Sequence, residues 1–217
     1  MRNLIVKEFK LATPLLTYLF IGFAVMTLIP GYPILCGAFF MCLGLFQGYQ
    51  YSREAGDLDY SILLPVKKTD IVRAKFAAAA LLELAMFMLC MVFTLIRMTW
   101  LSDVAVYVQN ALMGANFLSL GFILLIFALF NWVFIGGFFK TAYGIGKPFV
   151  WFIALCFGLI ITAEALHHLP GLAWINPLGF SHMCMQLAAL GAGVAVYAGV
   201  TILACRIAEK RFQQIDL

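Results

Sequence analysis

Long apolar runs alternate with short polar connections along most of this chain. Six of the runs are long enough to cross about 30 Å of hydrocarbon as helices that rise about 1.5 Å per residue. We place these expected spans at residues 14–30, 33–51, 76–96, 117–139, 148–165 and 183–205. The pattern therefore predicts an all-α, polytopic protein with six transmembrane helices.

Three segments outside these runs mix polar and apolar residues. Residues 1–12 place Leu4 and Phe9 among charged neighbours, which predicts an amphipathic helix that lies in the headgroup region. Residues 98–116 are too polar for the middle of a bilayer and are expected to form an interfacial lead-in to the fourth span. Residues 166–182 are expected to form an outer re-entrant turn.

Composition supports a membrane protein. Hydrophobic residues make up 65% of the 217 and charged residues 11%, and the mean hydropathy is +1.02. Soluble domains carry about 25% charged residues. The whole of residues 1–217 is expected to be one transmembrane domain in contact with the lipid bilayer. A formal net charge of +4 indicates no nucleic-acid partner.

The basic residues predict the orientation. With six spans, 13 of the 14 lysines and arginines fall on the side of the two termini, and Arg97 alone falls opposite. Because cytoplasmic segments carry the excess of Lys and Arg, both termini and residues 52–75 are expected to be cytoplasmic in a cell membrane.

Residues 52–75 collect five of the 14 basic and four of the 10 acidic residues around the apolar "YSILLPV". This combination predicts a short amphipathic helix that docks in the groove of another protein, with apolar anchors and charges that select the partner. The alternative is a solvated loop whose basic residues only fix the topology. Pro65 is expected to end this helix, and Thr69 or Asp70 to cap the next. The candidate contact residues are Glu54, Asp57, Asp59, Tyr60, Leu63, Leu64, Lys67, Lys68 and Asp70.

Motifs for catalysis or ATP binding are missing. The closest approach to a phosphate-binding loop, "TAYGIGKP", has Thr141 where the first glycine is required and Pro148 after the lysine. No H-E-x-x-H or G-x-S-x-G occurs. We therefore expect no catalytic residues and no cofactor in this chain.

Two polar groups near or within the spans have open roles. Glu83 is either a residue of a transport pathway or a structural carboxyl that joins the third span to a neighbour. Glu164, His167, His168 and His182 fall in one short outer stretch, where a metal site is conceivable but spacing fixes no fourth strong ligand. We expect an interfacial turn there and no metal.

The stretch "REAGDLDYSILLPVKKTDIVRAKF" (residues 53–76) resembles the cytoplasmic segment of small type-2 ABC exporter permeases. The six-span layout and "WINPLGFSH" (residues 174–182) are similar to the same family, which includes half-size permeases of phenol-soluble modulin exporters and of bacteriocin-immunity exporters. The resemblance implies a bacterial permease in which residues 57–70 form the coupling helix.

The resemblance also implies partners. The permease would pair with a second permease, identical or related, and with two copies of a separate ABC ATPase that binds ATP and Mg²⁺. Its cargo would be an amphipathic peptide or another lipophilic molecule, moved outward. The alternative from the residues is a membrane-embedded enzyme or a non-transport scaffold. The scattered polar groups favour transport.

Overall fold

A computed structural model describes all residues except 142–143, 167, 173–174, 177–178 and 216–217. The described residues form helices, turns and loops, with no strand among them. The elements, with η for 3-10 and π helices, are α1 (Arg2–Lys7), η1 (Glu8–Ala12), α2 (Leu15–Phe20), η2 (Ile21–Leu28), α3 (Leu35–Glu54), α4 (Asp57–Leu63), α5 (Lys68–Thr99), α6 (Ala105–Val108), α7 (Phe117–Leu129), η3 (Phe130–Ile135), α8 (Gly136–Phe138), α9 (Gly146–Leu166) and α10 (Met183–Gln213).

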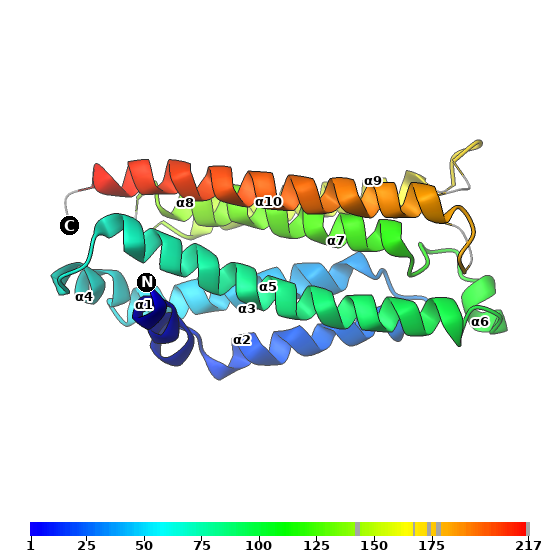
Figure 1. Cartoon of the computed structure of the whole chain (residues 1–217), viewed down its shortest axis with the longest axis horizontal. Helices are drawn as coiled ribbons and strands as arrows, with labels where there is room; N and C mark the ends of the chain where they lie inside the picture. Colours follow the sequence, from blue (N-terminus) through cyan, green and yellow to red (C-terminus); the bar gives the residue numbers. More distant parts are fainter. Residues whose placement is uncertain (142–143, 167, 173–174, 177–178, 216–217) are drawn as a thin grey trace.

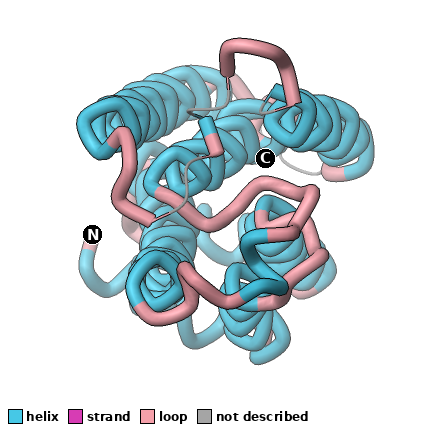
Figure 2. The backbone as a smooth tube through the Cα atoms, turned by 90° about the vertical axis from the view of Figure 1, so that its right-hand side faces the viewer, coloured by secondary structure: helices cyan, strands magenta, loops and turns pink. Residues whose placement is uncertain are grey.

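The long helices lie side by side along one axis (Figure 1). One end of this bundle carries α1, α4 and the last turns of α10, and the other carries α6 (Figure 1). We call the first end the basic end and the second the far end. The helix ends and connections of the basic end hold the lysines and arginines other than Arg97. Figure 2 looks along the bundle from the far end and shows the helices grouped end-on.

Four helices in the described part of the chain are long and apolar enough to cross a membrane. These are α5, α9, α10 and the continuous rod made of α7, η3 and α8 (Phe117–Phe138). A fifth span exists if the segments 2–12 and 15–28, which meet at a bend of 94°, are taken together. The protein is therefore a multi-pass, all-helical membrane protein. The full count of six spans stays a prediction.

The first two expected spans are helical but differ from the other four. The pair α2–η2 has only 14 residues, although its 3-10 part lengthens it to about 25 Å because a 3-10 helix rises about 2.0 Å per residue. Helix α3 has 20 residues, but Gln47, Gln50 and the charged pair at 53–54 make its second half polar. Thr17 donates its hydroxyl to the Gly44 carbonyl at 2.8 Å and joins the two.

The three segments expected outside the spans, residues 1–12, 98–116 and 166–182, differ in structure. Residues 2–12 are helical and turn by 94° into α2 at Pro14, which fits a helix across the bundle end. Residues 98–116 contain the short α6 and turns. The expected turn at 166–182 lies partly outside the described residues, so its re-entrant form stays a prediction.

The rod from α7 through α8 is the most buried of the four candidate spans. It begins with a capping box, in which the Asn116 side chain accepts from the Ser119 backbone N–H and the Ser119 hydroxyl accepts from the Asn116 backbone N–H. Aromatic rings fill the space beside it. The fully buried Phe134 meets the rings of Phe46 and Tyr49 edge to face at 5.4 and 5.3 Å, a favourable ring geometry.

Helices α7 and α10 make the most extensive contact of any two elements. Two glycines allow it: a Cβ atom on Gly193 would lie 2.9 Å from the Cα atom of Gly121. Small residues let membrane helices approach closely, which favours their association. The sequence places Gly191 only two residues away on α10, where an added Cβ would meet nothing within 4 Å.

This pair of glycines gives a matched test. We expect Gly193→Ala to lower the thermal stability of the purified protein by several degrees, because the obstacle is the backbone of α7 and cannot rotate away. Gly191→Ala is expected to leave stability unchanged or to raise it slightly, since alanine favours helix by about 0.5–1 kcal/mol over glycine. Thermal unfolding in mild detergent measures both, and equal effects would contradict the close contact.

Candidate functional site

Two residues set the ends of helix α4. Gly56, its N-cap, has φ 61°, a left-handed conformation that glycine adopts without strain. Leu64, its C-cap, is extended, as expected for a residue before proline. The helix ends at Leu63 and is shorter than the expected coupling helix of residues 57–70.

The next helix starts without the expected cap. Lys67 is the N-cap of α5 and makes no side-chain capping bond. Asp70 lies in the first turn, where a carboxylate is favoured by the helix dipole. The prediction that Thr69 or Asp70 caps α5 is therefore wrong.

Helix α4 has a buried face and an exposed face. Asp57, Leu58 and Ser61 are buried, whereas Tyr60 is 58% and Leu63 84% exposed. Asp59 is exposed beside them. An amphipathic helix with apolar side chains on its outer face is the form expected of a docking element.

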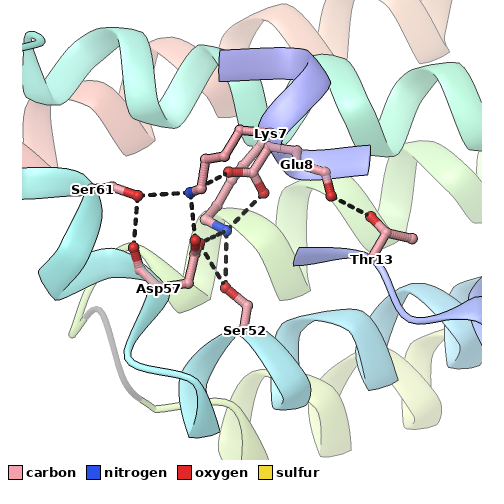
Figure 3. A network of polar contacts seen from close by, with 7 residues as sticks. Lys7, Glu8, Thr13, Ser52, Asp57 and Ser61 are labelled. Atoms are coloured by element: carbon pink, nitrogen blue, oxygen red, sulfur yellow. Dashed lines mark hydrogen bonds and ion pairs between the residues drawn. The ribbon is translucent and has the colours of Figure 1, made fainter. Parts of the chain in front are cut away.

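A polar network lies directly under α4 (Figure 3). Asp57 forms ion pairs with Lys7, at the end of α1, and with Lys75, on α5. Lys75 also pairs with Glu8 at 2.9 Å, and Lys7 with Glu8 at 3.1 Å. Two ammonium groups and two carboxylates from α1, η1, α4 and α5 therefore form one neutral group of charges.

Two hydroxyl groups complete the network. Ser52, near the end of α3, accepts from Lys75 at 3.0 Å and donates to Asp57 at 2.9 Å. Ser61 accepts from Lys7 at 2.7 Å and donates to the backbone oxygen of Asp57 at 2.6 Å. Each side chain of the network thus uses several of its hydrogen-bonding groups.

The position of Asp57 corrects the expectation that its carboxylate faces a partner. The residue is 8% exposed and is bound by the two lysines. Burial opposes its ionisation, but the charges of Lys75 and Lys7 outweigh this effect, and its pKa lies below the ordinary value. The ionised Asp57 therefore stabilises the fold above the ordinary pKa of an aspartate, and this contribution is lost as the pH falls through the lowered value.

The other candidate contact residues are spread over the corner around α4. Glu54 and Lys67 are exposed, and Leu64 and Asp70 are half-buried. Lys68 is half-buried and donates to the backbone oxygen of Ile215 at 2.6 Å, near the end of the chain. Among the candidate contact residues, the exposed ones are therefore Glu54, Asp59, Tyr60, Leu63 and Lys67.

A second link joins α5 to α10 at the basic end. Arg73 donates to both carboxylate oxygens of Glu209, at 2.7 and 3.1 Å. Such two-point contacts fix orientation. Together with the bond from Lys68, they attach the first turns of α5 to the last turns of α10.

Glu83 is fully buried in the middle of α5 and joins three helices. Its Oε2 accepts from the Tyr197 hydroxyl at 2.7 Å and from the Asn131 amide at 3.0 Å. Asn131 lies in the π-helix η3 and also donates to Thr201 on α10 at 3.1 Å. This arrangement favours the structural interpretation of Glu83, since the carboxyl is enclosed and binds side chains of two neighbouring elements.

The outer acidic and histidine residues have different surroundings in the described part of the chain. Glu164 accepts from the Met113 backbone N–H at 2.8 Å, so one of its oxygens holds the loop before α7. His182 adopts a left-handed conformation ahead of α10, and His167 lies outside the described residues. The described residues contain no group of three or more His, Cys, Asp or Glu placed to hold a metal ion.

The buried network predicts which acidic residue near α4 supports the fold. Asp57→Asn should lower the free energy of unfolding by about 3–5 kcal/mol, because it leaves buried ammonium groups without their counter-charge. Glu54→Gln, at an exposed position nearby, should change it by less than about 0.5 kcal/mol. Unfolding by a denaturing detergent measures both, and a stable Asp57→Asn protein would argue against the network.

The Glu83 contacts predict a measurable coupling. In a double-mutant cycle with Glu83→Ala and Tyr197→Phe, we expect a coupling energy of about 0.6–1.7 kcal/mol, which runs from the average to the maximum for hydrogen bonds between membrane helices. A cycle of Glu83→Ala with Gly191→Ala serves as the control and should give none. Additive effects of the first pair would mean that the bond contributes nothing to the fold.

Comparison with known proteins identifies the family of this chain. A family model described as ABC-2 family transporter protein matches residues 3–208, almost the whole chain. No curated protein and no solved structure matches. The match agrees with the all-helical membrane fold and with the missing phosphate-binding loop. The chain therefore belongs to the ABC-2 family of transporter proteins and is a membrane permease subunit of an ABC transporter.

Proposed function

We propose that this chain is the half-size permease of a bacterial type-2 ABC exporter and that α4 is its coupling helix. In this proposal a separate ABC ATPase, present in two copies, binds ATP and Mg²⁺ and receives the exposed face of α4. The observation that carries the proposal is the pair of apolar side chains, Tyr60 and Leu63, that point outward over a buried ion network.

The outward face of α4 has the chemistry of an interface anchor. A tyrosine and a leucine one turn apart are flanked in the sequence by the exposed charged residues Glu54, Asp59 and Lys67. Interfaces typically combine a few large anchors with a charged rim that selects the partner. A loop that served only to fix topology would not need exposed apolar side chains in this position.

The buried face of α4 provides the mechanical connection. Asp57 binds Lys75, which lies on the 32-residue helix α5, so a displacement of α4 would move α5 with it. Arg73 and Lys68 extend the connection to α10 and the end of the chain. ATP-driven closure of a docked ATPase dimer would in this way reach two of the membrane helices.

The remaining features of the proposal concern cargo and assembly. The permease would pair with a second permease, identical or related, and the exposed face of α10 with Ala195 and Gly199 suits close helix packing. The cargo would be an amphipathic peptide or another lipophilic molecule moved outward, with both termini of the permease in the cytoplasm. Apolar hollows between the helices are compatible with such cargo.

The experiment tests contact and activity separately. A photo-crosslinking amino acid is placed at position 63, and at position 100 as a control, because Trp100 is 81% exposed at the far end. The tagged chain is isolated from its native membranes after illumination. We expect position 63 to crosslink to a protein with a phosphate-binding loop, and position 100 not to do so.

Substitution of the two anchors supplies the functional readout. Tyr60→Ala with Leu63→Ala should reduce ATP hydrolysis in the isolated complex at least tenfold, since central anchors contribute more than about 1 kcal/mol each. Trp100→Ala should leave it unchanged. All variants should keep the melting temperature of the isolated permease. Full hydrolysis by the double variant, or crosslinking from position 100 alone, would refute the role of α4.

A further inference from the structure

Arg97 is unusual among the basic residues of this chain. It lies near the far end of α5, two residues before the helix ends at Thr99, whereas the other 13 lysines and arginines belong to the basic end. It is nevertheless 5% exposed. A residue at the end of a helix could reach water easily, so its burial calls for a physical reason.

The contacts of Arg97 do not neutralise its charge. The guanidinium donates to the Thr27 backbone oxygen at 2.9 Å and lies 4.6 Å from the ring centre of Tyr107. Tyr107 in turn donates its hydroxyl to the Leu28 backbone oxygen at 2.9 Å. Within the described residues, no carboxylate forms an ion pair with Arg97.

A buried charge without a counter-charge is costly, and a guanidinium has five N–H groups to satisfy. Only one hydrogen bond of Arg97 is formed within the described chain. The other nitrogen atoms are not sealed in the core, because the side chain lines an open cavity. This cavity has a volume of about 180 Å³, far more than the roughly 10–15 Å³ that one water molecule requires.

The cavity brings further hydrogen-bond donors beside Arg97. Asn110 and Asn176 line it, and each uses its amide oxygen to accept a backbone N–H, from Leu112 and from Gly114. Their NH₂ groups therefore remain as donors for a ligand, whereas the hydroxyl of Ser102, which also lines the cavity, donates to Asp103 at 3.3 Å. Asp103, the acidic residue closest in sequence, is exposed and forms no ion pair with Arg97 among the described residues.

The surroundings of the cavity indicate the depth at which it opens. Trp100, three residues after Arg97, is 81% exposed, and Val104, Val106 and Val108 on and beside α6 are 41–57% exposed. Exposed tryptophan and apolar side chains at the end of a membrane helix are typical of the headgroup region. The most abundant anion at that level is the phosphate of phospholipid headgroups.

We propose that the Arg97 cavity binds a phosphate oxyanion, and that a phospholipid headgroup of the adjoining leaflet supplies it. The planar guanidinium presents two parallel N–H groups to a phosphate, which is the geometry that makes arginine a preferred phosphate ligand. The amides of Asn110 and Asn176 would donate to the remaining oxygens. The bound lipid would thereby hold η2, α5 and α6 together at the far end.

The test uses the purified full chain in mild detergent and three probes. These are dihexanoyl phosphatidylglycerol, which is water-soluble and carries the phosphate; dihexanoyl glycerol, which lacks it; and inorganic phosphate. Calorimetry gives the affinities, and thermal unfolding gives the stabilisation of the wild-type chain. We expect the phosphate-bearing lipid to bind and to raise the melting temperature, and the neutral lipid to do neither.

Variants connect the binding to the cavity. Arg97→Gln should weaken binding of the phosphate-bearing lipid at least tenfold, and Arg97→Lys should give an intermediate loss because it keeps the charge but not the planar fork. Arg206→Gln, which removes an exposed cation at the basic end, should leave the affinity unchanged. If Arg97→Gln does not fold, the lysine variant and the wild-type stabilisation decide the question.

The outcomes separate the two parts of the proposal. Tight binding of inorganic phosphate with the same dependence on Arg97 would support an oxyanion site and overturn the lipid as its source. Absence of lipid binding by the wild type would overturn the proposal. Equal losses in the Arg97 and Arg206 variants would do the same, because they would indicate attraction by net charge alone.

Discussion

The neutral group of four charges at the basic end fixes the position of the elements around it. Lys7, Glu8, Asp57 and Lys75 come from two helical turns at the start of the chain, from α4 and from α5, and none of them is exposed. Buried charges are stable only when each finds its opposite in good geometry. The network therefore sets the rotation of α4, and with it the face that Tyr60 and Leu63 present outward.

Helix α5 connects this network with the rest of the molecule. Its buried polar side chains bind a different set of elements at three depths: Lys75 binds η1 and α4, Glu83 binds η3 and α10, and Arg97 binds η2. These three residues are spread over about 33 Å, at about 1.5 Å per residue. In a membrane, where no hydrophobic driving force brings helices together, such polar contacts help close packing to specify which helices are neighbours.

Much of the fold could be predicted from the sequence, because the lengths of apolar runs and the breaks at Gly56 and Pro65 are local properties. The pairing of Lys7 with Asp57 is not local, since 50 residues separate them. The pattern "DLDYSIL" also does not reveal which aspartate of α4 is buried, because Asp57 and Asp59 differ only in what lies opposite them. The only hint in the sequence is that the four residues of the network, two basic and two acidic, balance in charge. The 3-10 and π segments, η2 and η3, depend on tertiary packing and left no sequence signal.

The same four charges can be assembled only in the order in which the chain is made. Lys7 and Glu8 leave the ribosome first, Asp57 follows about fifty residues later, and Lys75 arrives last, at the start of the third apolar run. Until then Glu8 has only Lys7 as an ammonium partner, because its second partner in the folded protein is Lys75. The four-charge network is therefore incomplete while α2 and α3 are being made, and the 94° bend keeps residues 2–12 separate from the helix that follows. In a nascent chain that stops before residue 75, we expect residues 2–12 to be accessible to proteases.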